Sequence, residues 1–221
     1  GRTKEYDAII AVGEGQTYIG NRQNDTDFIK HEDLSVKSLT QFKGRNYVAS
    51  NKGLWQVKNT KFVRDELFNI DDKARLTLVF GENQHLWYAI EGKGLYYRDE
   101  SNDTTMHFSE APAYFYTAIF NADSSKVLFG SNNGVFEYDI SSDLFKKLPQ
   151  EVNGTSLGAY VGNSAQDSFG TCWFSLDEGL LGFTKSGDIR AITAQRFLPS
   201  TLIYTLNTDS NGNLIVGTNK G

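Results

Sequence analysis

The sequence contains one cysteine, one methionine and three prolines among its 221 residues. A lone cysteine excludes an internal disulfide framework. Cys172 stands beside Trp173 in a strand-like stretch, which predicts a buried and unreactive thiol. No run of about eighteen apolar residues occurs, so no segment of this chain is predicted to cross a membrane as a helix.

Positive charge is also scarce. Lysine and arginine total 22 against 27 aspartates and glutamates, which gives a formal net charge of -5. Basic residues do not gather anywhere, since Lys146-Lys147 is only a pair. Binding to phosphates needs a positive surface field, so we expect no nucleic-acid partner.

Residue patterns typical of catalysis and metal binding are missing as well. His31, His85 and His107 lie far apart and lack the spacing of metal ligands. Gly13 and Gly15 follow a strand-like stretch, but no helix pattern comes after them, as a nucleotide-binding loop would require. No Ser-His-Asp or paired-carboxylate arrangement stands out. We therefore expect no metal, no cofactor and no catalytic residues, and a chain that is not an enzyme.

The stretch Asp209–Asn213 is rich in polar oxygen atoms but also fails as an ion site. It lacks the alternating acidic ligands and the closing glutamate of a calcium loop. Asp, Ser, Asn and Gly are the residues of tight turns, so the sequence predicts a turn here.

The strongest positive feature of the sequence is an internal repeat. The stretches "YVASNKGLW", "WYAIEGKGLYY", "LFGSNNGVFEY", "WFSLDEGLLGF" and "LIVGTNKG" each place a polar turn and a glycine after an apolar strand. Their glycines recur about forty residues apart, at Gly53, Gly94, Gly134, Gly179 and Gly221. A degenerate earlier copy at residues 17–25 lacks the glycine.

Each repeat has the same internal order of short strands. First strands are predicted at residues 9–12, 38–42, 76–80, 117–120, 158–161 and 204–206. The stretches quoted above supply the second and third strands, and weaker fourth strands are predicted at 61–63, 106–108 and 144–147. Short strands between Gly, Asn, Asp and Ser turns, without a helical stripe, indicate an all-β chain.

Four antiparallel strands in about forty residues is the size of a β-propeller blade. We predict one propeller over residues 1–221, with blades near 6–33, 34–67, 76–108, 115–148, 157–193 and 203–221. Five blades and half of a sixth would leave the ring incomplete, and its open edges would favour self-association. Two apolar columns support the alignment: Tyr18, Tyr47, Trp87, Leu128, Trp173 and Ile215 in the second strands, and Leu54, Leu95, Val135 and Leu180 after the glycines.

These repeats resemble the two-component regulator propeller repeat. Its pattern is a D-x-x-G-x-L turn, a strand ending in a small residue with Thr or Ser, and then a Gly-Leu turn. "DSNGNLIVGTNKG" at residues 209–221 matches closely, although Ile215 stands where that family has Trp. Trp87 and Trp173 keep the Trp, while the first turn departs from the pattern in "GENQHLW" and "SSKVLF". The resemblance extends from about Tyr6 to Gly221.

The resemblance implies the extracytoplasmic, periplasmic sensor region of a bacterial two-component or related signalling protein. A membrane anchor and an output module would lie in segments outside this chain. The expected role is non-catalytic recognition of a carbohydrate or another small polar ligand. Two alternatives stay open, a protein-interaction propeller scaffold and a propeller enzyme of the lyase or glycosidase type, because a fold does not fix a function.

Meander topology suggests where a ligand would bind. The loop between the second and third strands lies on the same edge as the connection to the next blade. The turns at 51–52, 91–93, 132–133 and 177–178 should therefore share this edge with the linker "APAYFYT", which carries Tyr114, Phe115 and Tyr116. Aromatic and polar groups suit a polar ligand. The predicted binding residues are Glu91, Tyr114, Tyr116 and Asp177.

Overall fold

The computed structural model describes residues 8–13, 16–21, 28–65, 68, 70–71, 73–82, 84–99, 104–108, 111–193 and 197–220. Within these residues all regular structure is β-strand, paired antiparallel, which confirms the all-β prediction. The chain divides into two compact parts, residues 1–114 and 115–221, and each is described separately.

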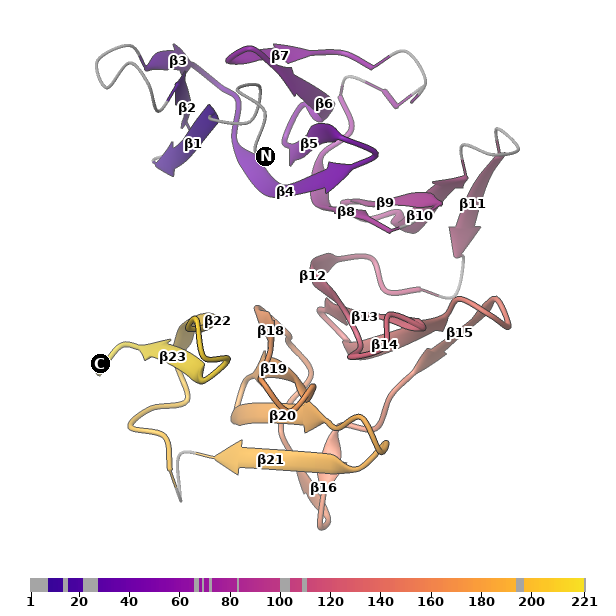
Figure 1. Cartoon of the computed structure of the whole chain (residues 1–221), viewed down its shortest axis with the longest axis vertical. Helices are drawn as coiled ribbons and strands as arrows, with labels where there is room; N and C mark the ends of the chain where they lie inside the picture. The colour runs from indigo at the N-terminus through magenta and orange to yellow at the C-terminus, as the bar shows by residue number, and fades with distance from the viewer. Residues whose placement is uncertain are drawn as a thin grey trace. The chain divides into compact units, whose positions relative to one another are not determined.

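The first part contains three sheets (Figure 1). The first has β1 (Ala8–Gly13), β2 (Gln16–Asn21) and β3 (Ile29–His31). The second has β4 (Val36–Phe42), β5 (Arg45–Ser50), β6 (Gly53–Lys58) and β7 (Lys61–Val63). The third has β8 (Leu76–Gly81), β9 (His85–Ile90), β10 (Gly94–Asp99) and β11 (Thr104–Phe108). The last two sheets are the four-stranded meanders predicted for blades.

The second part repeats the pattern. One four-stranded sheet has β12 (Phe115–Phe120), β13 (Lys126–Ser131), β14 (Gly134–Asp139) and β15 (Leu144–Lys147). The next has β18 (Ser164–Gln166), β19 (Cys172–Leu176), β20 (Gly179–Phe183) and β21 (Ile189–Thr193). A two-stranded sheet of β22 (Ile203–Thr208) and β23 (Leu214–Thr218) follows. Gly221 and residues 22–27 of the first repeat lie outside the described residues.

The repeat glycines form the turns between second and third strands. The four that the structure describes all have positive φ: Gly53 88°, Gly94 95°, Gly134 100° and Gly179 148°. Glycine adopts such angles without steric cost. At Gly179 a Cβ atom would also lie 2.3 Å from the carbonyl oxygen of Ile192, so the neighbouring backbone leaves no room for a side chain.

Most members of the two predicted apolar columns are buried. Leu54, Leu95, Val135 and Leu180 are at most 3% exposed, and Tyr47, Trp87, Leu128 and Trp173 at most 6%. Burial of each such side chain stabilises the fold by about 1.5–3 kcal/mol. The columns are thus confirmed as core at these positions, but not at Tyr18, which is half-buried, or at Ile215, which is 50% exposed. Cys172 is buried, as predicted.

Hydroxyl groups connect the first strands of neighbouring sheets. Ser38 Oγ on β4 accepts the amide of Val79 on β8 at 2.6 Å, and Thr40 Oγ1 accepts the amide of Gly81 at 2.9 Å. In the second part Thr117 of β12 bonds Ser164 of β18. These first-strand amides have no further strand to pair with, so the side chains of the adjacent blade satisfy them.

The predicted first strand at residues 158–161 is wrong. That segment is a connection, and the first strand of its sheet is β18, six residues later than expected. Gly158 has a φ of 92°, outside the strand region, and the amides of Ala159 and Tyr160 bond to a side chain. An unpredicted hairpin precedes it, formed by β16 (Glu151–Val152) and β17 (Thr155–Ser156).

Candidate functional site

The turns between second and third strands lie against the segments that lead into the first strands. In each case the amide of a turn residue donates to the carbonyl just before the first strand or its connection. The bonds are Asn51 to Ser35 (3.1 Å), Glu91 to Arg75 (2.7 Å), Glu178 to Leu157 (3.0 Å) and Asn219 to Leu202 (3.3 Å). The turns at 51–52, 91–93 and 177–178 therefore each lie against the segment that precedes the first strand of their own sheet.

In the first part this edge brings Glu91 close to the segment that carries Tyr114. The amide of Gly92 donates to the carbonyl of Ala113 at 3.1 Å. The Glu91 carboxylate is already engaged, because its Oε2 lies 3.0 Å from Nε of Arg75. Tyr114 is half-buried. Glu91 thus forms an ion pair with Arg75 within the fold.

In the second part the predicted residues Tyr116 and Asp177 meet through a residue that the sequence reasoning missed. The ring of Tyr116 packs on that of Tyr160, with centroids 5.1 Å apart and planes inclined by 46°. Asp177 Oδ2 accepts the amides of Ala159 at 2.9 Å and Tyr160 at 3.1 Å. One carboxylate oxygen therefore holds the backbone of the loop that presents Tyr160.

Gly158 makes this arrangement possible. A Cβ atom there would lie 2.3 Å from Asp177 Oδ2, and the φ of 92° also favours glycine. The close approach brings the carboxylate beneath the loop, where two successive amides point at it. Charge-assisted bonds of this kind are stronger than neutral ones. Asp177 is thus a positioning residue for the loop.

The Tyr116–Tyr160 pair presents an aromatic surface to solvent. Tyr160 is 48% exposed, whereas Tyr116 is half-buried. An exposed tyrosine combines an apolar ring with a hydroxyl that donates and accepts hydrogen bonds. Phe115 does not contribute, because it is fully buried and packs on Phe129 and Phe136. The Phe115 backbone lies at this edge, opposite Ser131 at the end of β13, but its buried ring is out of reach of a ligand.

The four predicted residues thus form two separate groups. Glu91 and Tyr114 belong to residues 1–114, and Tyr116 and Asp177 to residues 115–221. Only the second group, completed by Tyr160, combines an exposed aromatic ring with a carboxylate-anchored loop. We call Tyr116, Tyr160 and Asp177 the tyrosine site.

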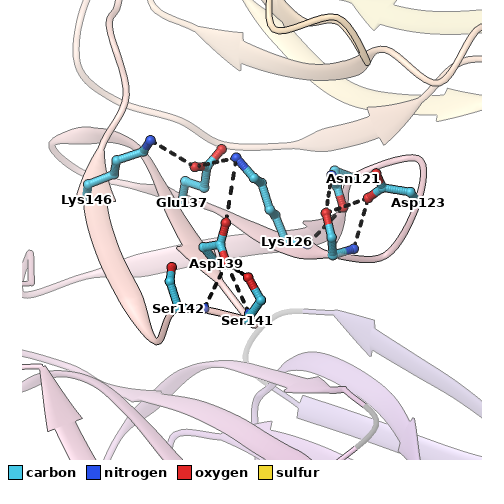
Figure 2. Close-up of polar contacts among 9 residues, drawn as sticks. Asn121, Asp123, Lys126, Glu137, Asp139, Ser141, Ser142 and Lys146 are labelled. Atoms are coloured by element: carbon cyan, nitrogen blue, oxygen red, sulfur yellow. Dashed lines mark hydrogen bonds and ion pairs between the residues drawn. The ribbon is translucent and has the colours of Figure 1, made fainter.

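A charged cluster on the sheet β12–β15 is structural (Figure 2). The buried carboxylate of Glu137 lies between two ammonium groups, 2.9 Å from Lys126 Nζ and 3.1 Å from Lys146 Nζ. Asp139 accepts bonds from the Ser141 hydroxyl and the Ser142 amide, which lower its pKa to about 2. The Glu137 ion pairs cross adjacent strands, whereas the Asp139 bonds stay within the turn that follows β14.

Three further features concern metal binding, membrane-spanning helices and the Asp209 turn. In the described part of the chain, no group of three or more His, Cys, Asp and Glu side chains is arranged to hold a metal ion. The described residues also contain no helix long and apolar enough to cross a membrane. Asp209 forms the predicted turn, since its Oδ1 accepts the amides of Asn211 and Asn213, both at 2.8 Å.

Comparison with known proteins gives no match to a family model and none to a curated protein sequence. Solved structures do match. The extracellular domain assigned to the hybrid two component system BT4673 from B. thetaiotaomicron has a TM-score of 0.66 at 17% identity, over 98% of this chain and 31% of that one. The corresponding domain of BT3049 from the same organism has a TM-score of 0.65 at 17% identity, over 96% and 32%.

A third structure, virginiamycin B lyase from Staphylococcus aureus, has a TM-score of 0.61 at 14% identity, over 94% of this chain and 75% of that one. Because a sensor domain and an enzyme match almost equally well, the likeness concerns architecture and leaves activity open. The chain spans about a third of the length of the two extracellular domains. Its fold is the β-propeller blade arrangement that those extracellular domains share, as the resemblance to the two-component regulator propeller repeat implies.

Proposed function

We propose that this chain is a non-catalytic recognition region of an extracytoplasmic bacterial sensor, and that it binds a carbohydrate or another small polar ligand at the tyrosine site. Location in the periplasm and anchorage through segments outside this chain belong to the proposal. The observation that carries it is the exposed Tyr160 ring, packed on Tyr116 and held on a loop whose amides bond to Asp177.

Rigid presentation is what suits this site to recognition. A ligand pays less conformational entropy when the groups that contact it are already ordered. Asp177 fixes the loop, and Tyr116 limits the rotation of the Tyr160 ring. The apolar face of a sugar ring can lie on such a tyrosine while its hydroxyl groups reach the phenol oxygen.

Likeness to the extracellular domains of hybrid two component systems supports the sensing role as an analogy of fold. Self-association is a further part of the proposal, since unpaired strand edges attract partner strands. Light scattering over a range of protein concentrations tests it, and a concentration-independent monomer would contradict self-association without affecting the ligand site.

The decisive experiment is a saturation-transfer NMR screen with neutral di- and trisaccharides. The best-binding sugar is then titrated against Tyr160→Ala, Tyr160→Phe and, as a matched control, Tyr204→Ala. Tyr204 is another exposed tyrosine, 64% exposed on β22. Tyr160→Ala should weaken binding about tenfold and Tyr160→Phe less, because the phenylalanine ring remains.

Equal affinities for Tyr160→Ala and Tyr204→Ala would overturn the site. Conversion of any bound sugar into products, followed by NMR over hours, would overturn the non-catalytic role.

A further inference from the structure

A pocket lies at the end of the sheet β18–β21 that is opposite the tyrosine site. The tyrosine site includes the turn between β19 and β20, whereas this pocket is formed by the turns between β18 and β19 and between β20 and β21. Its volume is about 590 Å³, and it is lined by Phe169, Thr171, Thr184, Lys185, Ser186 and Arg190. We call it the Arg190 pocket.

Strand register explains why these residues meet. Trp173 on β19, Gly182 on β20 and Arg190 on β21 are direct neighbours across the sheet. Residues two positions away lie on the same face, which adds Thr171 and Thr184. Gly182 has no side chain, and a Cβ there would lie 2.8 Å from the Trp173 ring, so the indole closes over the glycine.

Thr171 contributes a hydroxyl group to this pocket. The residue is only 2% exposed, yet among the described residues no hydrogen bond is made by its side-chain oxygen. The neighbouring hydroxyls are occupied, since Thr184 bonds Ser186 at 2.9 Å and Ser186 donates to Asp188 at 2.7 Å. The Thr171 hydroxyl is therefore available to a ligand.

Two cationic side chains line the same pocket. Arg190 makes no ion pair within the described part of the chain, and Lys185 makes none within 4.0 Å. Two carboxylates are near. Asp188 accepts from Ser186, and Asp123 has its pKa lowered chiefly by its bonds to Ser125 and in smaller part by the charge of Lys185. Both carboxylates have hydrogen-bond partners in their own turns. The guanidinium of Arg190 is therefore the positive group that can pair with a ligand.

Phe169 adds an apolar platform. Phe169 is 83% exposed, so its ring is accessible to a ligand. Asp167 Oδ1 accepts the Phe169 amide at 2.9 Å and the Thr171 amide at 2.9 Å, so the turn that carries the ring is fixed by side-chain bonds.

We propose that the Arg190 pocket binds a small ligand that joins a ring to a single carboxylate, as a sugar acid or an aromatic carboxylate does. The carboxylate pairs with the Arg190 guanidinium, which can donate two parallel hydrogen bonds, and Lys185 adds positive charge. The ring lies on Phe169, and Thr171 bonds a polar atom of the ligand. This site goes beyond the proposed function, since it uses none of the residues of the tyrosine site.

Isothermal titration of the whole chain with sodium glucuronate, sodium benzoate and neutral glucose tests the proposal. At least one of the two carboxylates should bind with a dissociation constant of about 1 mM, and glucose should not. Glucuronate alone would identify a sugar acid, and benzoate alone an aromatic carboxylate. Absence of saturable binding by both up to about 50 mM, or equal binding of glucose, would overturn the proposal.

Variants locate the binding. Arg190→Gln and Phe169→Ala should each weaken the bound carboxylate about tenfold, and Arg190→Lys less, because it keeps the charge but loses the fork of donors. Lys37→Ala removes one exposed positive charge from β4 and serves as the control for net charge. Equal losses of affinity in Arg190→Gln and Lys37→Ala would show that the ligand binds elsewhere and would overturn the proposed site. Tyr160→Ala should leave this binding unchanged, so failure of one site is distinguishable from failure of the other.

Discussion

Asp167 holds Trp173 in place, because its Oδ2 accepts the indole N–H at 2.8 Å. The same carboxylate bonds the amides of Phe169 and Thr171 through Oδ1. Asp209 occupies the equivalent turn of the next repeat and bonds two amides in the same way, but Ile215 replaces the tryptophan there. The two turns differ in the partner of Oδ2, which is the buried indole N–H for Asp167 and the exposed side-chain amide of Asn213, at 2.8 Å, for Asp209.

This pair of turns gives a matched test. Asp167→Ala should lower the free energy of unfolding by about 2–4 kcal/mol, since it removes bonds to a charged acceptor and leaves the indole N–H of the core unpaired. Asp209→Ala should cost only about 1 kcal/mol, because its turn is exposed to water. Urea unfolding followed by tryptophan fluorescence measures both. Equal losses would show that the indole bond contributes nothing.

Alanine substitutions at two glycines should distinguish the cost of backbone strain from the cost of a steric clash. Gly154 has a φ of 76° and nothing within 4 Å of a Cβ position, so Gly154→Ala should cost about 1–2 kcal/mol from strain alone. At Gly158 the same strain is joined by contact with Asp177. We expect Gly158→Ala to cost more in thermal unfolding and to shift the amide NMR signals of residues 159 and 160. A loss no larger than that of Gly154→Ala would contradict the close packing.

Two tyrosines should resist ionisation. Burial raises the pKa of Tyr47 and Tyr88 to about 12, against about 10 in an unfolded chain. Because the folded state favours the neutral phenols, this contribution to stability is complete below pH 10 and is lost as the pH rises through about 12. A titration followed by near-ultraviolet absorbance should show the phenol groups of Tyr47 and Tyr88 ionising at higher pH than the other tyrosines, at the pH where the protein unfolds. Ionisation of all 11 tyrosines in one step near pH 10, with native circular dichroism, would contradict it.

Cys172 should be protected from thiol reagents. Its thiol donates to the carbonyl of Phe120 at 3.3 Å, and burial raises its pKa, so little thiolate forms near neutral pH. Labelling by a chromogenic disulfide should be at least about a hundredfold slower in buffer than in urea, because it requires opening of the sheet. Rapid labelling of the folded protein would refute this protection.

The sequence pattern predicted those elements whose shape depends on local chemistry. The repeat glycines and the apolar positions around them located the second and third strands, because positive φ and burial each leave a mark at single positions. The hairpin β16–β17 has such a mark too, an Asn153-Gly154 pair with φ of 52° and 76°, typical of a two-residue hairpin turn.

The candidate site was harder to predict, because it depends on contacts between distant residues. Tyr160 lies in an alternation of small and apolar residues that favours a strand, and only the Asp177 carboxylate, 17 residues away, diverts its amide from strand pairing. Phe115 and Tyr116 are adjacent in the linker, yet one is core and the other lies beside Tyr160. No local pattern separates them.

The hydroxyl contacts between β4 and β8 have an evolutionary consequence. Ser38 and Thr40 each bond an amide 41 residues further along, which is one repeat length. A unit that carries acceptors on one flank and free amides on the other is complementary to its own duplicate. Gene duplication can then lengthen such a protein in frame, and the new copy meets a ready partner without compensating mutations.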